Sequence, residues 1–396
     1  MTTVMITSAV RTAIGDFQGA LAGMAPTALG ALVAKEAIKR AGISADDVQQ
    51  AVFGNVIHTA PEDMYLSRVV ALNAGVPETA PALTLNRLCG SGLQAVVSAA
   101  EQIILGNAEV TLAGGAENMS RSGHLLSARA GIRFGDARAI DMMVGALTDP
   151  FGKIHMGLTA ENIAERQGIG RAEQDSFARE SHRRAAAAIS TGHFSDQILP
   201  VTVTQGRQET TFDTDEHVRP GVTLTELEKL RPAFRKDGKV TAGNASGIND
   251  GAAALILMSA EKAAATGAKP LARIVSYGLG GVAPDVMGLG PIPATRQALE
   301  RANLSVNDLD IIESNEAFAA QACAVTTTLG FDPAKVNPDG GAIALGHPIG
   351  ASGAIILTKL IYALQRTGGR YGLATMCIGG GQGIAVIVEA VPEVNG

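Results

Sequence analysis

The sequence contains no tryptophan, and aromatic residues make up only 4% of its 396 residues. Hydrophobic residues nevertheless make up 46%, so alanine, glycine, valine, isoleucine and leucine must fill the interior. Such an interior is typical of closely packed α/β proteins. The chain is also too long for one ordinary domain of roughly 100–200 residues. We therefore expect two or three structural units with an ample core.

Cysteine is scarce, since the sequence has only Cys89, Cys323 and Cys377. An odd and sparse set excludes a disulfide framework and favours a reducing compartment. No stretch approaches the ~20 apolar residues that span a bilayer. The first residues also lack the basic and apolar regions of a signal peptide. We therefore expect a soluble, cytoplasmic protein without a membrane partner.

Positive charge is in short supply as well, and the formal net charge at pH 7 is −6. This excludes the broad basic face of a nucleic-acid-binding protein, although a local cleft can still attract an anionic ligand. No two histidines have the spacing of a metal site, so no metal is expected. Residues 341–346 have the glycine spacing of a phosphate-binding loop, but His347 stands where that loop needs lysine.

Apolar runs and helical spacing predict alternating strands and helices. The predicted strands are residues 3–10, 52–57, 82–85, 109–113, 252–258, 309–312 and 373–376. The predicted helices are residues 26–40, 93–106, 159–168 and 171–191. Arginines, histidines and polar turns become dense after residue 118, and an apolar strand returns near residue 252. This change predicts an insertion over residues 119–249.

The second half of the chain repeats the first. Residues 37–48 align with residues 298–309 and share several identical positions. The same offset places Ser91 on Ser352, each at the start of a predicted helix. When this offset is increased by four residues, the pair Gly114-Gly115 matches Gly379-Gly380. The repeat predicts two duplicated α/β halves, with a site between them that receives loops from both.

Cys89 lies where a predicted strand turns into a predicted helix, in the run Asn86-Arg87-Leu88-Cys89-Gly90-Ser91-Gly92. A helix N-terminus carries a partial positive charge and unpaired N–H groups. Both features lower the pKa of a thiol, which predicts that Cys89 is a nucleophile. The alternative is a buried cysteine at a strand end, because free cysteine is usually a small core residue. Cys323, in an alanine-rich helix, is interpreted in that way.

Three further stretches carry residues with catalytic chemistry. Asn315 opens an Asn-Glu-Ala-Phe run after a predicted strand. His347 stands in a Gly-His-Pro-Ile-Gly run, where a histidine can stay neutral or pair with a thiolate. Cys377 precedes three glycines whose N–H groups could face an oxyanion. Each also has an ordinary interpretation, as a turn or cap asparagine, a structural turn histidine and a core cysteine.

Together these four motifs resemble the thiolase family, specifically acetyl-CoA acetyltransferases of the biosynthetic type. The resemblance covers essentially the whole chain, and the order and separation of the motifs match. It implies an α/β fold with two duplicated halves in α-β-α-β-α layers and an inserted loop domain. The expected units are an N-terminal half begun by residues 1–118 and completed by 250–268, a CoA-binding insertion at 119–249, and a C-terminal half at 269–396.

The resemblance also implies a transferase activity, that of an acetyl-CoA C-acetyltransferase. Such an enzyme catalyses a ping-pong Claisen condensation and the reverse thiolysis. Cys89 would carry the acyl group, and Cys377 would take a proton from the methyl group of the second acetyl-CoA. His347, with a water held by Asn315, would stabilise the enolate oxygen. The N–H groups of Cys89 and Gly379 would stabilise the tetrahedral oxyanion.

CoA and acyl-CoA are the implied partners, and no cofactor is expected because CoA thioesters are the substrates. The insertion would supply much of the CoA site. Taken alone, Arg219 is interpreted as a solvated surface arginine; by resemblance, it and Leu147 lie near the nucleotide. The residues implied to contact CoA are Leu147, His155, Met156, Arg219, Ser246, Gly247, Ala317 and Phe318.

Residues 58–68 depart from the family, which commonly carries a Gly-Gln-Asn-Pro-Ala-Arg run over the active site. The run here is similar to that of bacterial 3-ketothiolases with a broader chain-length range, which puts strict acetyl specificity in doubt. One alternative is therefore a degradative 3-ketoacyl-CoA thiolase of broader chain length. Another is a non-catalytic acyl-CoA-binding member of the fold, which would lack Cys89, His347 or Cys377. Residues 124–143 resemble the loop that joins thiolase dimers, so we expect a homotetramer rather than a dimer.

Overall fold

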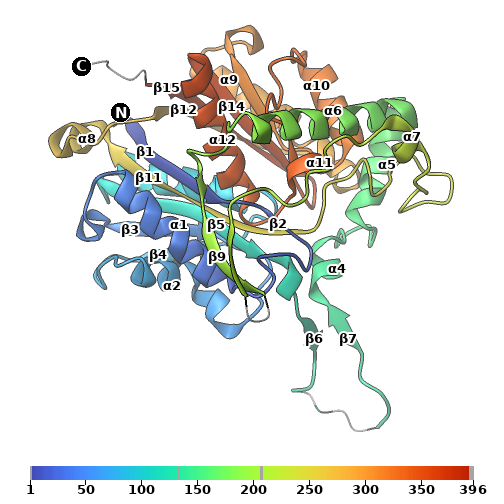
Figure 1. The fold of residues 1–396 in the computed structure, drawn as a ribbon, viewed down its shortest axis with the longest axis horizontal. Coiled ribbons are helices and arrows are strands. Elements are labelled where there is room, and N and C mark those ends of the chain that lie inside the picture. Colours follow the sequence, from blue (N-terminus) through green and yellow to red (C-terminus); the bar gives the residue numbers. More distant parts are fainter. Residues whose placement is uncertain (1, 130, 132–133, 206–207, 392–396) are drawn as a thin grey trace.

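Five layers of helices and sheets alternate in the computed structural model, which describes residues 2–129, 131, 134–205 and 208–391 (Figure 1). Helices form the two outer layers and the middle layer, and two groups of strands lie between them. The layered α/β fold predicted from the sequence is therefore confirmed. In the described part of the chain, no helix is both long enough and apolar enough to cross a bilayer.

The N-terminal sheet has the strand order β1-β11-β5-β3-β4. Strand β3 is parallel to β4 and β5, whereas β11 is antiparallel to both β5 and β1. Helices α1 and α2 pack on the outer face of this sheet. The bounds are β1 Val4–Thr12, β2 Gly15–Asp16, α1 Pro26–Arg40, β3 Gln50–Gly54, α2 Leu66–Asn73, β4 Ala82–Leu85, β5 Val110–Asn118, β11 Asn249–Ser259 and α8 Ala260–Thr266.

The C-terminal sheet repeats this topology in the order β12-β15-β14-β13. An isolated parallel bridge between Ile312 and Val336 stands where the fifth strand lies in the first half. Helix α9 packs on the outer face with α10 beside it, and a short pairing of β1 with β12 joins the two sheets. The bounds are β12 Ala272–Gly281, α9 Pro291–Ala302, β13 Ile311–Ser314, α10 Ala319–Leu329, α11 Ala342–Leu345, β14 Tyr371–Ile378 and β15 Gln382–Ala390.

Helices α3 (Ser91–Ile104) and α12 (Ser352–Thr367) pack against each other between the two sheets. Helix α12 is buried almost all round, which explains why its sequence is apolar on every face. Each helix begins at the equivalent serine of its half, so the predicted match of Ser91 with Ser352 is confirmed. The loops that lead into these two helices carry Cys89 and His347.

One part of the predicted repeat is wrong. Gly114-Gly115 lie inside β5, whereas Gly379-Gly380 lie in the turn after β14. Strands β5 and β14 begin at Val110 and Tyr371, which have the same separation as Ser91 and Ser352. The repeat therefore continues without the four-residue step, and the match between the two glycine pairs has no structural meaning.

Several predicted element boundaries also shift. The strand predicted at 52–57 lies at Gln50–Gly54, and the strand predicted at 109–113 continues to Asn118 because its glycines pair with β11 and β3. Strands β12 and β15 were not predicted, since the glycines at their facing ends favour a loop in the sequence pattern. The helices predicted at 159–168 and 171–191 are α5 and α6, with slightly different ends.

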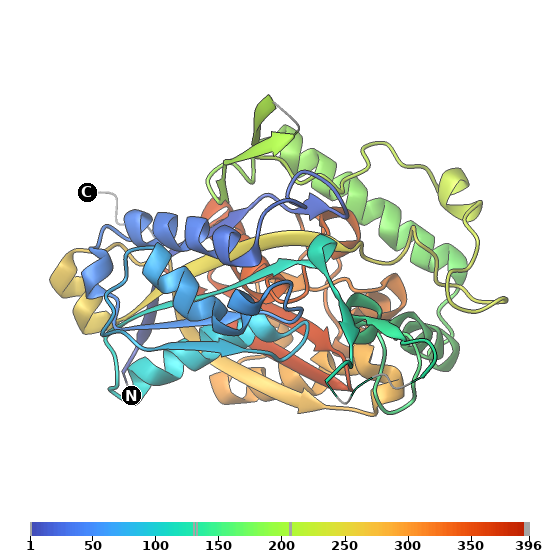
Figure 2. The same ribbon diagram turned by 90° about the horizontal axis from the view of Figure 1, so that it is seen from below.

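Residues 119–248 lie between β5 and β11, which are direct neighbours in the sheet. Figure 2 shows the long helix α6 and the β9–β10 ribbon at one edge of the molecule, and the β6–β7 hairpin projects from the body in Figure 1. The domain boundaries at 118, 249 and 268 remain a prediction. The bounds are β6 His124–Leu126, β7 Ala139–Asp141, α4 Met142–Ala146, α5 Met156–Arg166, α6 Arg171–Ser190, β8 Ile198–Leu199, β9 Val201–Gln205, β10 Gln208–Phe212 and α7 Leu224–Glu228.

Candidate active site

A cavity of about 420 Å³, which we call the main cavity, opens between the two halves and the segment 119–248. Cys89, His347, Cys377 and Gly379 all line it. So do all of the residues that the sequence associated with CoA, whereas Asn315 does not. Sequence reasoning gave no role to the other lining residues, of which Leu88 and Ile349 stand next to motif residues and most belong to no motif: Phe17, Leu88, Met119, Ala146, His217, Ala233, Phe234, Thr241, Ala242, Ala245, Ile248, Met287 and Ile349.

Cys89 sits on a tight turn directly before helix α3. The preceding residue, Leu88, has a φ of 47°, and its N–H donates to the side chain of Asn86 at 2.8 Å. The Ser91 hydroxyl donates to the Leu88 carbonyl at 2.7 Å and accepts from the N–H of Arg87 at 2.8 Å. These side-chain bonds fix the turn from both sides. Cys89 therefore lies just outside the first helical turn, with its side chain toward the main cavity.

Burial raises the pKa of Cys89 to about 11, so the prediction of a thiol with a lowered pKa is wrong. The backbone N–H of Gly379 and that of Cys89 itself act in the opposite direction, and the charge of Glu117 adds to the increase. Burial of a thiolate in apolar surroundings is more unfavourable than the hydrogen bonds from these N–H groups are favourable, so the pKa rises. At neutral pH the resting group is a thiol, which needs a base to become a nucleophile.

His347 lines the same cavity as Cys89. Its Nδ1 lies 2.6 Å from the hydroxyl oxygen of Ser352, and this hydroxyl donates its own hydrogen to the carbonyl of Pro348 at 2.9 Å. We assign the ring proton to Nδ1 on this basis. Nε2 is then an acceptor, and it has no hydrogen-bond partner among the described residues. Burial lowers the pKa of His347 to about 4, so the imidazole is neutral at pH 7.

Cys377 lies near the end of β14, in the part of the chain that turns back into β15. Burial raises the pKa of its thiol above the usual range, and the charge of Cys89 raises it further. The backbone N–H of Gly379, two residues later, acts on the thiol of Cys89 and lowers its pKa. The turn that follows Cys377 therefore brings a second thiol and a backbone donor to the nucleophile candidate.

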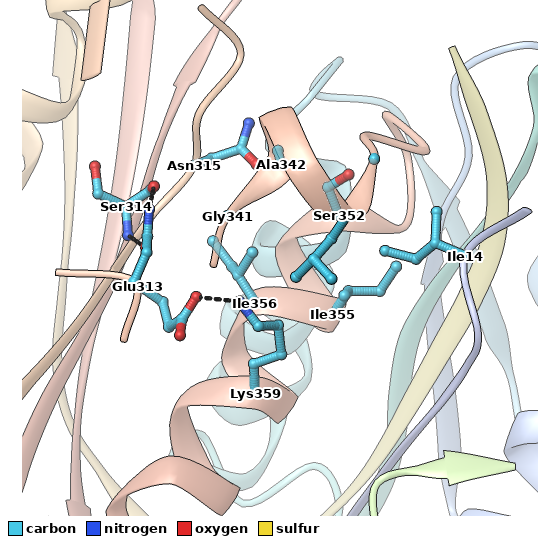
Figure 3. Close-up of a pocket in the computed structure, with 13 residues that line it drawn as sticks. Ile14, Glu313, Ser314, Asn315, Gly341, Ala342, Ser352, Ile355, Ile356 and Lys359 are labelled. Atoms are coloured by element: carbon cyan, nitrogen blue, oxygen red, sulfur yellow. Dashed lines mark hydrogen bonds and ion pairs between the residues drawn. The ribbon is translucent and has the colours of Figure 1, made fainter. Parts of the chain in front are cut away.

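Asn315 faces a separate, small cavity of about 10 Å³, behind the loop that carries His347 (Figure 3). Neither amide atom of Asn315 has a partner among the described residues. That volume suits about one water molecule, and a buried water needs such polar partners. Ser352 lines the same small cavity and holds His347. A buried ion pair between Lys359 and Glu313, at 2.8 Å, closes its far side (Figure 3).

Two family models cover almost the whole chain, since the thiolase N-terminal domain matches residues 4–261 and the thiolase C-terminal domain matches residues 268–390. The chain belongs to the thiolase family. It is 62% identical over 391 residues to the beta-ketothiolase BktB of Cupriavidus necator. This alignment covers 98% of this chain and 99% of that protein. It is 52% identical to an acetyl-CoA acetyltransferase of Chromobacterium violaceum, with the same coverage.

A solved structure gives the same result for the fold. The crystal structure of human mitochondrial 3-ketoacyl-CoA thiolase in complex with CoA has a TM-score of 0.96 and 44% identity, over 98% of this chain and 98% of that chain. These values cover both halves and the segment between β5 and β11. The five-layered arrangement of this thiolase is thus shared with a solved member of the family.

Aromatic side chains shape the part of the main cavity that reaches toward the surface of this thiolase. Phe234 stacks on His155 with ring centroids 4.7 Å apart, and it meets Phe318 edge-on at 6.2 Å. The backbone of Ser246 donates to the carbonyl of Ala317 at 3.0 Å, which ties the 242–248 stretch to the start of α10. We call this part the aromatic arm. It is narrow, largely apolar and built from both the insertion and the C-terminal half.

The remaining predicted CoA residues lie farther out or elsewhere on the wall. Arg219 lines the main cavity but is exposed to solvent, and its N–H donates to His182 Nδ1 at 3.2 Å. Leu147 and Met156 line the same cavity. In contrast, none of residues 58–68 lines it. Their departure from the family pattern therefore gives no information about the acyl chain length that this cavity accepts.

Proposed function

We propose that this thiolase is an acetyl-CoA C-acetyltransferase that condenses two acyl-CoA molecules to a 3-ketoacyl-CoA and CoA, and catalyses the reverse thiolysis. One observation carries the proposal: a thiol, a neutral imidazole with an unpartnered nitrogen, a second thiol and a backbone donor share one cavity. The names of the relatives, beta-ketothiolase and acetyl-CoA acetyltransferase, agree with it.

The first half-reaction would begin at Cys89. His347 Nε2 takes the thiol proton, and the sulfur attacks the thioester carbonyl of the first acyl-CoA. The N–H groups of Cys89 and Gly379 stabilise the negative oxygen of the tetrahedral intermediate. The bond to the CoA sulfur then breaks, and the leaving thiolate takes a proton from Cys377. The products are acyl-Cys89, free CoA, a Cys377 thiolate and a protonated His347.

The second half-reaction would use the thiolate left on Cys377. A buried thiolate with a raised pKa is a strong base, suited to removing a proton from the methyl group of a second acetyl-CoA. The Nε2–H of His347 stabilises the enolate oxygen in the main cavity. The enolate carbon attacks acyl-Cys89 and the sulfur leaves. It takes the proton from His347, which restores the starting state.

CoA binding to the main cavity and the aromatic arm is part of the proposal, and the reaction calls for no separate cofactor. The apolar walls of Phe234 and Phe318 suit the pantetheine chain, and exposed Arg219 suits the anionic nucleotide end. The related human thiolase of the same fold is described in complex with CoA. A non-catalytic role is disfavoured because Cys89, His347 and Cys377 are all present.

A broader chain-length range, as in a degradative 3-ketoacyl-CoA thiolase, is the second candidate. Methionine adapts its shape to different ligands, and Met119, Met156 and Met287 all line the main cavity. The rates of thiolysis of 3-ketoacyl-CoA substrates of increasing length separate the two. A sharp maximum at acetoacetyl-CoA supports acetyl specificity, and similar rates for longer chains support the broader enzyme.

A homotetramer in the cytoplasm completes the proposal. The β6–β7 hairpin projects from the body and exposes Leu125, Leu126 and Ile140 (Figure 1). An exposed apolar patch of this kind favours contact with another chain. The three cysteines are free of disulfide bonds, as expected in a reducing compartment. Light scattering of the purified protein tests the tetramer.

The decisive experiment mixes the protein with acetyl-CoA alone and follows it by intact mass and peptide mapping. One acetyl group on the Cys89 peptide, removed by free CoA, is expected. The Cys89→Ser variant should bind CoA but take up no CoA-labile acetyl group. Acetylation at Cys377 alone would mean that the roles of the two cysteines are exchanged. No adduct on folded, CoA-binding protein would leave only a binding function.

A further inference from the structure

Glu117 is a buried carboxylate that the proposed mechanism does not use, although it lies next to the reacting groups. It is on β5, and none of its surface is exposed. Strand β3 ends at Gly54, opposite Gly115, so β5 continues beyond its neighbour. The side chain of Glu117 therefore faces backbone groups that have left the sheet. Its charge is close enough to Cys89 to raise the pKa of that thiol.

Four donors surround this carboxylate. Oε1 accepts from the side-chain amide of Asn55 at 3.0 Å and from the N–H of Ile57 at 3.1 Å. Oε2 accepts from the N–H of Val56 at 3.0 Å and from that of Gly350 at 2.9 Å. An ionised carboxylate offers about four lone-pair sites and no donor. A protonated acid would direct its hydrogen at one of these donors, so the hydrogen bonds match the ionised form.

Burial acts against ionisation and raises the pKa of Glu117 above its usual range, with a smaller contribution from the charge of Asp63 in the turn after Thr59. The N–H groups of Ile57, Val56 and Gly350 act in the opposite direction. The hydrogen-bond geometry favours the ionised form, because the O–H of a neutral acid at this position would point at a buried N–H. We therefore assign the charged form to Glu117 at neutral pH.

Glu117 also connects the two halves at the catalytic loop. The loop that carries His347 belongs to the C-terminal half, and Gly350 lies near its end, two residues before α12. A Cβ at Gly350 would lie 2.5 Å from Glu117 Oε2, so only glycine allows this approach. The other end of the loop is held as well, because the N–H of His347 donates to Asn249 Oδ1 at 2.9 Å. Asn249 is on β11, the strand that pairs with β5.

We propose that ionised Glu117 is a positioning residue, which holds the His347 loop against Cys89 and keeps Cys89 in its thiol form until acylation begins. Its negative charge disfavours a thiolate at Cys89, while its hydrogen bond to Gly350 fixes the loop that carries His347. Its titratable neighbours are Asp63, whose charge raises the pKa of Glu117, and Cys89, whose pKa Glu117 raises. The inference rests on the roles proposed above for Cys89 and His347.

The test measures the rate of Cys89 acetylation by acetyl-CoA against pH, together with kcat for thiolysis. Glu117→Gln removes the charge and turns an NH₂ group toward two donors. Its kcat should fall by about 10- to 100-fold, the size of effect that misplaced catalytic groups give. The part of its pH profile that is set by ionisation of Cys89 should move to lower pH by about half a unit or more, because loss of the negative charge lowers the pKa of this thiol.

Two further variants separate position from charge. Glu117→Asp keeps the charge but is one methylene too short to reach both loops, so kcat should fall while the pH profile stays in place. Gly350→Ala forces the loop away from the intact carboxylate and should give the same pattern. Glu161→Gln is the matched control, since Glu161 is equally buried and accepts from the N–H groups of Lys239 and Val240. It should lower the melting temperature without moving the pH profile.

The outcomes are distinct. If the parent protein is not acetylated at Cys89, the proposed function fails, whatever Glu117 does. If the parent is acetylated and Glu117→Gln has an unshifted pH profile, the present inference is wrong. If that variant does not fold, Glu117→Asp and Gly350→Ala decide, and parental kcat in both would overturn the inference. A shifted profile in the Gln variant, with unshifted profiles in the other two, supports it.

Discussion

Replacement of Ser352 by alanine should slow acetylation of this thiolase, because it removes the group that fixes the tautomer of His347. The hydroxyl accepts from His347 Nδ1 at 2.6 Å and donates to Pro348 at 2.9 Å. Without it, the buried Nδ1–H has no partner, which costs about 1–3 kcal/mol. The Nδ1–H tautomer thus loses the hydrogen bond that favours it, and in the other tautomer a protonated Nε2 cannot take the proton of Cys89. Since 1.4 kcal/mol is a factor of ten, the acetylation rate should fall by roughly 5- to 150-fold.

The assay is rapid mixing with acetyl-CoA, followed by acid quench and mass measurement of the Cys89 peptide. Thr358→Ala is the matched control, because Thr358 is on the same helix, is equally buried, and loses one hydroxyl bond to the carbonyl of Ala354 at 2.9 Å. Both variants should lose some thermal stability, but only Ser352→Ala should acetylate slowly. Equal acetylation rates in the two variants would refute the role given to Ser352.

Three other results are expected. Cys377→Ser should still form the acyl-enzyme, more slowly, but should lose condensation by several orders of magnitude, because a serine hydroxyl is a much weaker acid than a thiol and leaves almost no anion to act as the base; product analysis by mass spectrometry checks this. The lower limb of the acetylation pH profile should have its midpoint near 4, since burial lowers the pKa of His347 to about 4 and the protonated ring cannot act as a base. Phe234→Ala should raise KM for acetyl-CoA about tenfold with little change in kcat, because the aromatic arm loses its stack on His155 but the reacting groups do not move. A KM equal to that of the parent would exclude the arm as a CoA contact.

The sequence was informative wherever chemistry depends on a short run of residues. Cys89 and His347 could be named because glycines frame each of them, and the repeat places both before a helix. The state of Cys89 could not be predicted. The effect of a helix N-terminus on the pKa of Cys89 depends on neighbouring residues, so it can be predicted from the sequence. Burial depends on packing by β14 and the C-terminal half, and it has the larger effect on this pKa. Phe234 and Glu117 were missed for a related reason, since their partners are remote in sequence and neither residue belongs to a recognisable motif.

The direction of the Asn315 side chain could not be predicted from the sequence either. The motif placed it in the active site, but its side chain faces the small cavity rather than the main cavity. A difference of one side-chain direction cannot be read from a motif, because it depends on how α11 and α12 pack behind the strand. Ser352 links the two spaces, since it lines the small cavity and bonds to the ring that lines the main one.

Duplication explains how one arrangement came to hold both a nucleophile and a base. Ser91 begins α3, and its hydroxyl donates back to the Leu88 carbonyl while accepting from a backbone N–H. Ser352 begins α12 and donates to the Pro348 carbonyl, four residues back rather than three, and the group it accepts from is the imidazole of His347. The first serine thus fixes the turn that carries the thiol. The second, at the equivalent position, bonds to a different carbonyl of its loop and fixes the proton on the base, so the two halves place a serine alike and use it for different chemistry.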